Sequence, residues 1–219
     1  MTDTADPVFA LVRERDLDRY LASLYAPPAA RTGLLALHAL DLEMAEVART
    51  TTEPMLGQIR LAWWREQLEG LDAGKRPAQP VLAAVADHIL PAGISGASLE
   101  PLEDAYLALL EGDLAAYAVS RSRLFEAAAT LLGGDTANAK RLGEGWALVE
   151  AARRGSDVDA TLLNRAADLL APAATARPLI GLAALARRDL AALRAGRRPG
   201  HRGSPGRQAR LLWSIISGR

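Results

Sequence analysis

This sequence has no cysteine and few aromatic residues, and each shortage excludes certain sites or folds. Without cysteine there are no disulfides, no thiolate nucleophiles and no cysteine-ligated zinc or iron–sulfur sites. Aromatic residues make up only 5% of the chain, and runs of β-branched residues are almost absent, whereas alanine and leucine dominate. Because alanine and leucine favour helices, the composition predicts an all-α fold. A half-apolar chain of 219 residues suffices for one sizeable core and is short for two ordinary domains.

Long hydrophobic runs are missing as well. No window offers the roughly 18 uninterrupted apolar residues that a membrane span needs. The acidic start MTDTADP lacks the basic and then apolar layout of a secretory signal. The sequence therefore predicts a cytoplasmic protein, and the lack of cysteine is consistent with a reducing compartment.

Charge is polarised along the chain although the net charge is zero. Residues 187–219 hold nine arginines against the single acid Asp189, so the remainder of the chain is acidic. Within this basic part, residues 196–206 are rich in glycine, proline and arginine and have no apolar period, which predicts a mobile linker. The stretch that follows, residues 209–216, is too apolar for a free tail and predicts a helix that docks on the rest of the protein.

Apolar residues recur at steps of three and four along most of the chain, which predicts amphipathic helices. The clearest stripes cover residues 28–49 and 53–71. Further helices are expected over residues 80–90, 99–117, 123–132, 136–154, 159–170 and 177–195. The expected organisation is a helical domain, residues 1–195, followed by a basic linker and a terminal docking helix, residues 196–219.

Three segments resemble the squalene/phytoene synthase family: DRYLASLYAPPAARTGLLALHALDLEMAEVA (18–48), IRLAWWREQL (59–68) and LGEGWALVEAARRG (142–155). The resemblance implies an isoprenoid-synthase fold, a helical bundle around a central apolar cavity, with two aspartate-rich helices facing each other across its mouth. In the family's enzymes these aspartates hold magnesium ions that bind allylic diphosphates, and two prenyl chains then join head to head. LEMAEV and the second segment look closest to the branch that includes a mitochondrial complex I assembly factor, regarded as non-catalytic.

The first aspartate-rich motif of the family is degraded in this sequence. When LHAL is aligned with the family's LYAF, the first aspartate falls on Ala45, its neighbour on Glu46 and the last aspartate on Arg49. Because a helix turns by about 100° per residue, one side of it carries His38, Asp41, Ala45 and Arg49. Magnesium prefers several hard oxygen ligands, and no pair of carboxylates at i and i+4 points into the cavity here.

The second motif has reversed its charge. The family's NxxRD pattern falls on Glu150, Arg153 and Arg154, so a cation replaces the metal-binding aspartate. Glu150 precedes Arg154 by four residues, an arrangement that favours a structural ion pair on the helix. Alternatively, Arg49 and Arg154 replace magnesium as the positive partners of a carboxylate or of a bound anionic head group. The carboxylates expected as partners are Asp41 and Glu150.

Other polar residues have simpler interpretations. Glu43 and Glu46 are expected on a solvated or packing-edge face. His38 occupies the place of a family tyrosine and has no metal-ligand spacing to the other histidines, so we expect a hydrogen-bonded helix histidine. Trp63 and Trp64 are adjacent and must face different directions.

The sequence thus predicts a non-catalytic family member that binds a protein partner or an isoprenoid-like ligand, with an accessory or assembly role and no metal cofactor. The residues expected to bind are His38, Asp41, Ala45, Arg49, Glu150, Arg153 and Arg154. One alternative is an active head-to-head prenyltransferase of isoprenoid biosynthesis that uses magnesium. Another is a helical interaction module with a filled core.

The basic C-terminal segment allows two further interpretations. Arginines beside the apolar residues 211–216 suit a peripheral contact with an anionic membrane, and a solvated loop is the simpler reading. Nucleic-acid binding is not expected, because the arginines are not interleaved with aromatic residues and no recognition motif accompanies them.

Overall fold

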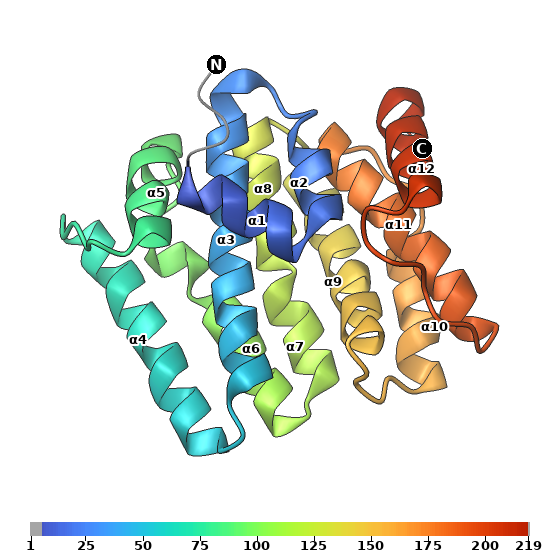
Figure 1. The fold of residues 1–219 in the computed structure, drawn as a ribbon, viewed down its shortest axis with the longest axis horizontal. Coiled ribbons are helices and arrows are strands. Elements are labelled where there is room, and N and C mark those ends of the chain that lie inside the picture. The colour runs from blue at the N-terminus through green and yellow to red at the C-terminus, as the bar shows by residue number, and fades with distance from the viewer. Residues whose placement is uncertain (1–5, 219) are drawn as a thin grey trace.

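A computed structural model describes residues 6–218, and every regular element in this part of the chain is a helix (Figure 1). The α-helices are α1 (Pro7–Arg15), α2 (Leu17–Ser23), α3 (Pro28–Thr50), α4 (Pro54–Asp72), α5 (Pro80–His88), α6 (Pro101–Glu111), α7 (Leu114–Arg121), α8 (Arg123–Leu132), α9 (Thr136–Arg153), α10 (Ala160–Leu169), α11 (Arg177–Arg194) and α12 (Pro205–Ser217). Two short 3-10 helices, η1 (Leu90–Ala92) and η2 (Ala97–Leu99), lie between α5 and α6. The all-α prediction is confirmed.

Helix α3 runs through the middle of the bundle and packs against α1, α5, α6 and α8. Most of its residues from 33 to 45 are fully buried, which agrees with the apolar stripe in its sequence. Helix α9 packs against α7, α8, α10 and α11, so the two helices that carry the degraded motifs both belong to the core of the bundle. Helices α4 and α12 lie at opposite edges in Figure 1.

The helix expected over residues 99–117 is two helices, α6 and α7. Gly112 ends α6 with a φ of +81°, a left-handed conformation that glycine adopts without strain. The side chain of Asp113 then accepts a hydrogen bond from the Ala116 N–H at 2.9 Å and begins α7. The apolar period continued across this break, which is why periodicity alone did not reveal it.

The two adjacent tryptophans of α4 face different directions, as predicted. Trp64 is buried and Trp63 is 42% exposed. Three further residues on the outer face of α4, Met55, Leu56 and Ile59, are also more than half exposed.

The segment expected to be a mobile linker lies against the helical domain. The Gly203 N–H donates to Asp18 Oδ1 at 2.8 Å, and Arg202 forms salt bridges with Asp16 and Glu150. Salt bridges and a hydrogen bond therefore hold this segment against the helical domain, although its sequence has no apolar period. The predicted terminal helix is present as α12, begins earlier than expected at Pro205, and packs on α11 through Leu211 and Ile215.

Within residues 6–218 no single helix is long and apolar enough to cross a membrane. The segments Pro80–Ala92 and Ala97–Glu111 pass that test only as a pair, and they bend by 104° relative to each other.

Candidate functional site

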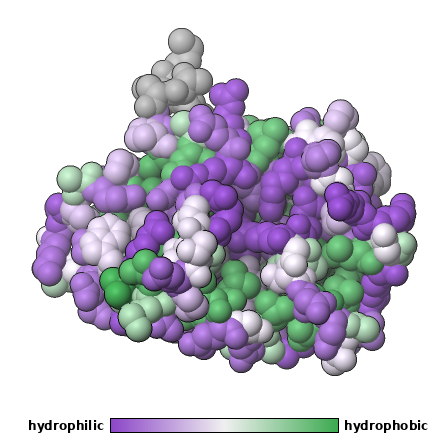
Figure 2. Space-filling model, turned by 60° about the horizontal axis from the view of Figure 1, so that its bottom comes forward, coloured by the Kyte–Doolittle hydropathy of each residue, from purple (hydrophilic) through white to green (hydrophobic). Residues whose placement is uncertain are grey.

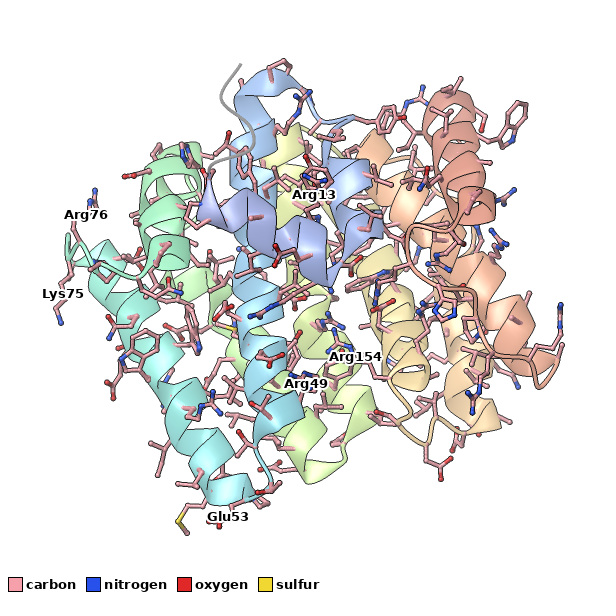
Figure 3. All side chains as sticks on the ribbon, viewed as in Figure 1. Arg13, Arg49, Glu53, Lys75, Arg76 and Arg154 are labelled. Carbon is pink, nitrogen blue, oxygen red and sulfur yellow. The ribbon has the colours of Figure 1, made fainter. Side chains whose placement is uncertain are left out.

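A cavity of about 850 Å³ opens between the C-terminal halves of α3 and α9. Arg49 from α3 and Arg154, which follows α9, lie on its two sides (Figure 3). Of the residues predicted to bind, Ala45, Arg49, Arg153 and Arg154 line this cavity. His38, Asp41 and Glu150 do not line it, because their side chains are buried in the bundle.

The cavity lining is strongly basic and also contains several apolar side chains. Its charged residues are Arg15, Arg49, Arg153, Arg154 and Arg202, against Asp16 and Glu46. Its apolar residues are Leu42, Ala45, Ala48, Leu109 and Ala151. Figure 2 brings the bottom of the molecule forward and shows hydrophilic residues gathered across this face with apolar residues beside them. Such a lining suits a ligand that has an anionic head and an apolar body.

Arg49 pairs with Glu46 and not with Asp41. Its guanidinium donates to both oxygens of Glu46, at 2.5 and 2.9 Å, from a side chain that is 71% exposed. Exposed pairs of this kind hold weakly, so a bound anion can compete for Arg49. Glu43 pairs with Arg15 at 3.0 Å, and both glutamates keep about a quarter of their side chains exposed, as the packing-edge interpretation predicted.

Asp41 is fully buried below the cavity, and four donors saturate its carboxylate. Arg121 approaches it with two nitrogens, Nε at 3.0 Å from Oδ1 and Nη2 at 2.7 Å from Oδ2. Arg19 Nη1 donates to Oδ2 at 2.6 Å, and the Tyr106 hydroxyl donates to Oδ1 at 2.8 Å. Burial by itself raises the pKa of Asp41, yet Arg121 and Arg19 outweigh it and hold that pKa well below its ordinary value. Asp41 is therefore a structural anion.

Aromatic rings enclose the two guanidiniums that hold Asp41. The guanidinium carbons of Arg19 and Arg121 lie 4.8 and 4.5 Å from the centre of the Trp146 ring. Arg121 also contacts the rings of Tyr106 and Tyr117, and it donates to the Tyr117 hydroxyl. These contacts, together with Asp41, help to stabilise the two buried guanidinium charges.

Glu150 is buried, and its pairing partner is Arg202 rather than Arg154. Arg202 Nη2 lies 2.5 Å from Glu150 Oε2, and Arg153 Nε approaches Oε1 at 3.8 Å. Burial by itself raises the pKa of Glu150, but Arg202 and then Arg154 lower that pKa below its ordinary value. The predicted i, i+4 salt bridge between Glu150 and Arg154 does not form, because the linker arginine occupies the carboxylate.

The buried ion pairs join into one alternating chain of five acids and five arginines. It runs in the order Arg121, Asp41, Arg19, Asp16, Arg202, Glu150, Arg153, Asp189, Arg207 and Asp18. The chain is electrically neutral and links α2, α3, α7, α9, α11, the 196–204 segment and α12. Each of its five carboxylates has an arginine as its counter-ion.

His38 differs from the prediction of a hydrogen-bonded histidine. It is fully buried, and neither Nδ1 nor Nε2 has a hydrogen-bond partner among the described residues. Burial, together with the nearby Arg19, lowers the pKa of His38 from 6.5 to about 3, so the ring is neutral at physiological pH.

The residues present do not fit a magnesium site. Residues 6–218 contain no group of three histidine, aspartate or glutamate side chains that could hold a metal ion. Both oxygens of Asp41 already accept from arginine, and Glu150 Oε2 does the same. A magnesium ion prefers about six oxygen ligands, and freeing two carboxylates for it would leave buried arginines without partners.

The sequence predicted which helices carry the degraded motifs, but it did not predict the arginines that pair with their buried carboxylates. Arg19, Arg121 and Arg202 were not among the predicted site residues. The one available signal was Asp41 on an otherwise apolar helix stripe, because a buried carboxylate requires a cationic or hydrogen-bonding partner.

The fold and its facing motif helices define an isoprenoid-synthase-type helical protein. The chain matches a solved dehydrosqualene synthase, crystallised with a ligand, with a TM-score of 0.74 over 96% of this chain and 94% of that one. Sequence identity in this match is 16%, so the likeness shows the fold alone. The profile of squalene/phytoene synthases matches residues 12–154, more than half of the chain. The chain therefore belongs to the squalene/phytoene synthase family.

Shorter matches connect the chain to one branch of this family. Complex I assembly factor 6 from Homo sapiens is 35% identical over 71 residues, which cover 32% of this chain and 21% of the human protein. The Bos taurus protein of the same name is 32% identical over 71 residues. The match thus spans about a third of this chain and about a fifth of these relatives, and it agrees with the predicted resemblance.

Proposed function

We propose that this protein is a non-catalytic member of its family that binds an anionic, isoprenoid-like ligand in the cavity without magnesium. The observation that carries the proposal is the saturation of Asp41 by Arg19, Arg121 and Tyr106. Ionising an allylic diphosphate requires neutralisation of the departing pyrophosphate, and in the family's enzymes carboxylate-held magnesium does this. Here Ala45 and Arg49 stand where the first motif has aspartates, and the nearby carboxylates Asp41, Glu46 and Glu150 are each paired with arginine.

The arginines that line the cavity support the proposed binding of an anionic ligand. Arg154 is exposed, lines the cavity and forms no salt bridge with any residue from 6 to 218. Arg49 is exposed, and among residues 6–218 its salt-bridge partner is the half-buried Glu46. Two guanidiniums on opposite walls present planar donor pairs to the oxygens of a phosphate or diphosphate. The apolar lining from Leu42 to Ala151 is suited to contact the first part of a prenyl chain.

An accessory or assembly role is part of the same proposal. Its support is the name of the relatives, complex I assembly factor 6, together with the loss of the metal ligands. Since the match covers a fifth of those relatives, the activity and partners of the whole proteins do not carry over directly.

Calorimetric titration with farnesyl diphosphate in the presence of EDTA tests the proposal. We expect saturable binding that magnesium does not strengthen, and a loss of about tenfold in affinity for Arg154→Gln, because one charge-assisted pair is removed. Arg13→Gln is the matched control, since Arg13 is exposed but lies outside the cavity lining. Thermal melts should show the same stability for both variants, because neither arginine forms a salt bridge within the described residues.

Two results would contradict the proposal. Magnesium-dependent release of pyrophosphate from farnesyl diphosphate, above a heat-inactivated control, would show catalysis. An affinity that is equal in the parent and the Arg154→Gln variant would show that the ligand does not reach this cavity.

A further inference from the structure

Helix α12 has two apolar faces, and only one of them is covered. Leu211 and Ile215 are buried against α11. On the other side of the same helix, Leu212, Trp213 and Ile216 are 41%, 65% and 67% exposed. These three residues, which we call the α12 stripe, recur at steps of one, three and four and therefore lie on one side of the helix. The terminal helix predicted from the sequence therefore packs on the bundle through one apolar face and leaves the α12 stripe exposed.

The surface beside the α12 stripe is also apolar. A groove of about 380 Å³ lies between α12 and the end of α2. Leu21, Leu24 and Tyr25 line it from one side, and Tyr25 is 45% exposed. An exposed tryptophan and tyrosine next to aliphatic residues are the side chains that favour the boundary between membrane headgroups and acyl chains.

The charge around the α12 stripe is positive. In residues 187–218 the only acid is Asp189, which is buried and held by Arg153 and Arg207. Arg210, on α12 itself, is exposed, and so is Arg177, whose guanidinium donates to the carbonyl oxygens of Ile215 and Ile216. Arg202 and Arg207 belong to the buried ion-pair chain, whereas Arg177 and Arg210 are exposed beside the α12 stripe.

We propose that the α12 stripe rests on an anionic phospholipid surface. Leu212, Trp213 and Ile216 enter the boundary between headgroups and acyl chains, and the exposed arginines contact lipid phosphates. The helix is 13 residues long, or about 20 Å, and lies on the outside of the bundle, so the whole stripe can reach a flat surface at once. The positive surroundings favour this partner over a second copy of the chain, because two such surfaces would repel each other.

Sedimentation of the full chain with lipid vesicles tests this inference. We expect the protein to sediment with vesicles of phosphatidylcholine and phosphatidylserine, to bind pure phosphatidylcholine much less, and to be released as salt rises. The double variant Trp213→Ala, Ile216→Ser should lose binding by about tenfold or more, since both large apolar side chains leave the interface. Arg210→Gln should weaken binding only to the phosphatidylserine vesicles.

The matched control lies on the opposite edge of the molecule. Trp63→Ala with Ile59→Ser removes the same two residue types from the exposed face of α4, where Trp63 is 42% and Ile59 61% exposed. This variant should bind vesicles like the parent. Equal loss in both double variants, or no binding of the parent to phosphatidylserine vesicles, would overturn the inference. A parent that self-associates without lipid, and that the α12 variant turns into a monomer, would identify a second copy as the occupant instead.

Discussion

Asp41→Ala is the substitution that should expose the buried ion-pair chain most directly. It leaves Arg121 in the core with aromatic rings as its remaining neighbours, whereas Arg19 keeps Asp16 at 3.0 Å. Removing one partner of a buried pair costs about 3–5 kcal/mol, because the charge left behind has neither water nor a counter-ion. A domain of this kind is stable by about 5–15 kcal/mol in total. The variant should therefore lose a large share of its free energy of unfolding.

Equilibrium unfolding in urea at neutral pH measures this loss. Glu46→Ala is the control, because it breaks the exposed pair with Arg49 and should leave the free energy of unfolding nearly unchanged. The double variant Asp41→Leu, Arg121→Met removes both charges together and should be more stable than Asp41→Ala alone. If Asp41→Ala costs less than about 1 kcal/mol, the carboxylate is not the structural centre of the site and a metal-binding role must be considered again.

Two further predictions concern His38 and the linker. Because burial lowers the pKa of His38 from 6.5 to about 3, only the unfolded state gains its proton as pH falls below 6.5. Below pH 6.5, His38 should therefore lower the free energy of unfolding by about 1.4 kcal/mol for each pH unit. Urea unfolding at several pH values should show a shallower decline for His38→Leu than for the parent, whereas the exposed His88→Gln should follow the parent. Arg202→Ala, at 24% exposure, should cost about 2 kcal/mol, because the buried Glu150 then keeps only the more distant Arg153 at 3.8 Å. Arg198→Ala should melt like the parent, and equal melting of the two variants would contradict the linker's structural role.

The sequence by itself determined the helical class, the position of α3 within a residue or two and the loss of both aspartate motifs. These features are local: helix periodicity and capping depend on residues a few positions apart, and a motif alignment shows directly that Ala45 and Arg154 replace aspartates. The sequence also predicted correctly that the motif helices carry both signs of charge. It did not predict which charges meet.

Only the tertiary structure decided the partners of each buried acid. Asp41 meets Arg19 and Arg121, which are 22 and 80 residues away, rather than Arg49 on its own helix. The basic C-terminal segment reads as a mobile linker because it has no apolar period, yet its Arg202 reaches Glu150 from 52 residues away. Long-range ion pairs leave no periodic trace in a sequence, since their geometry exists only after the helices have packed. The network of arginines and carboxylates around the motif helices therefore depends on contacts that form only when the chain folds.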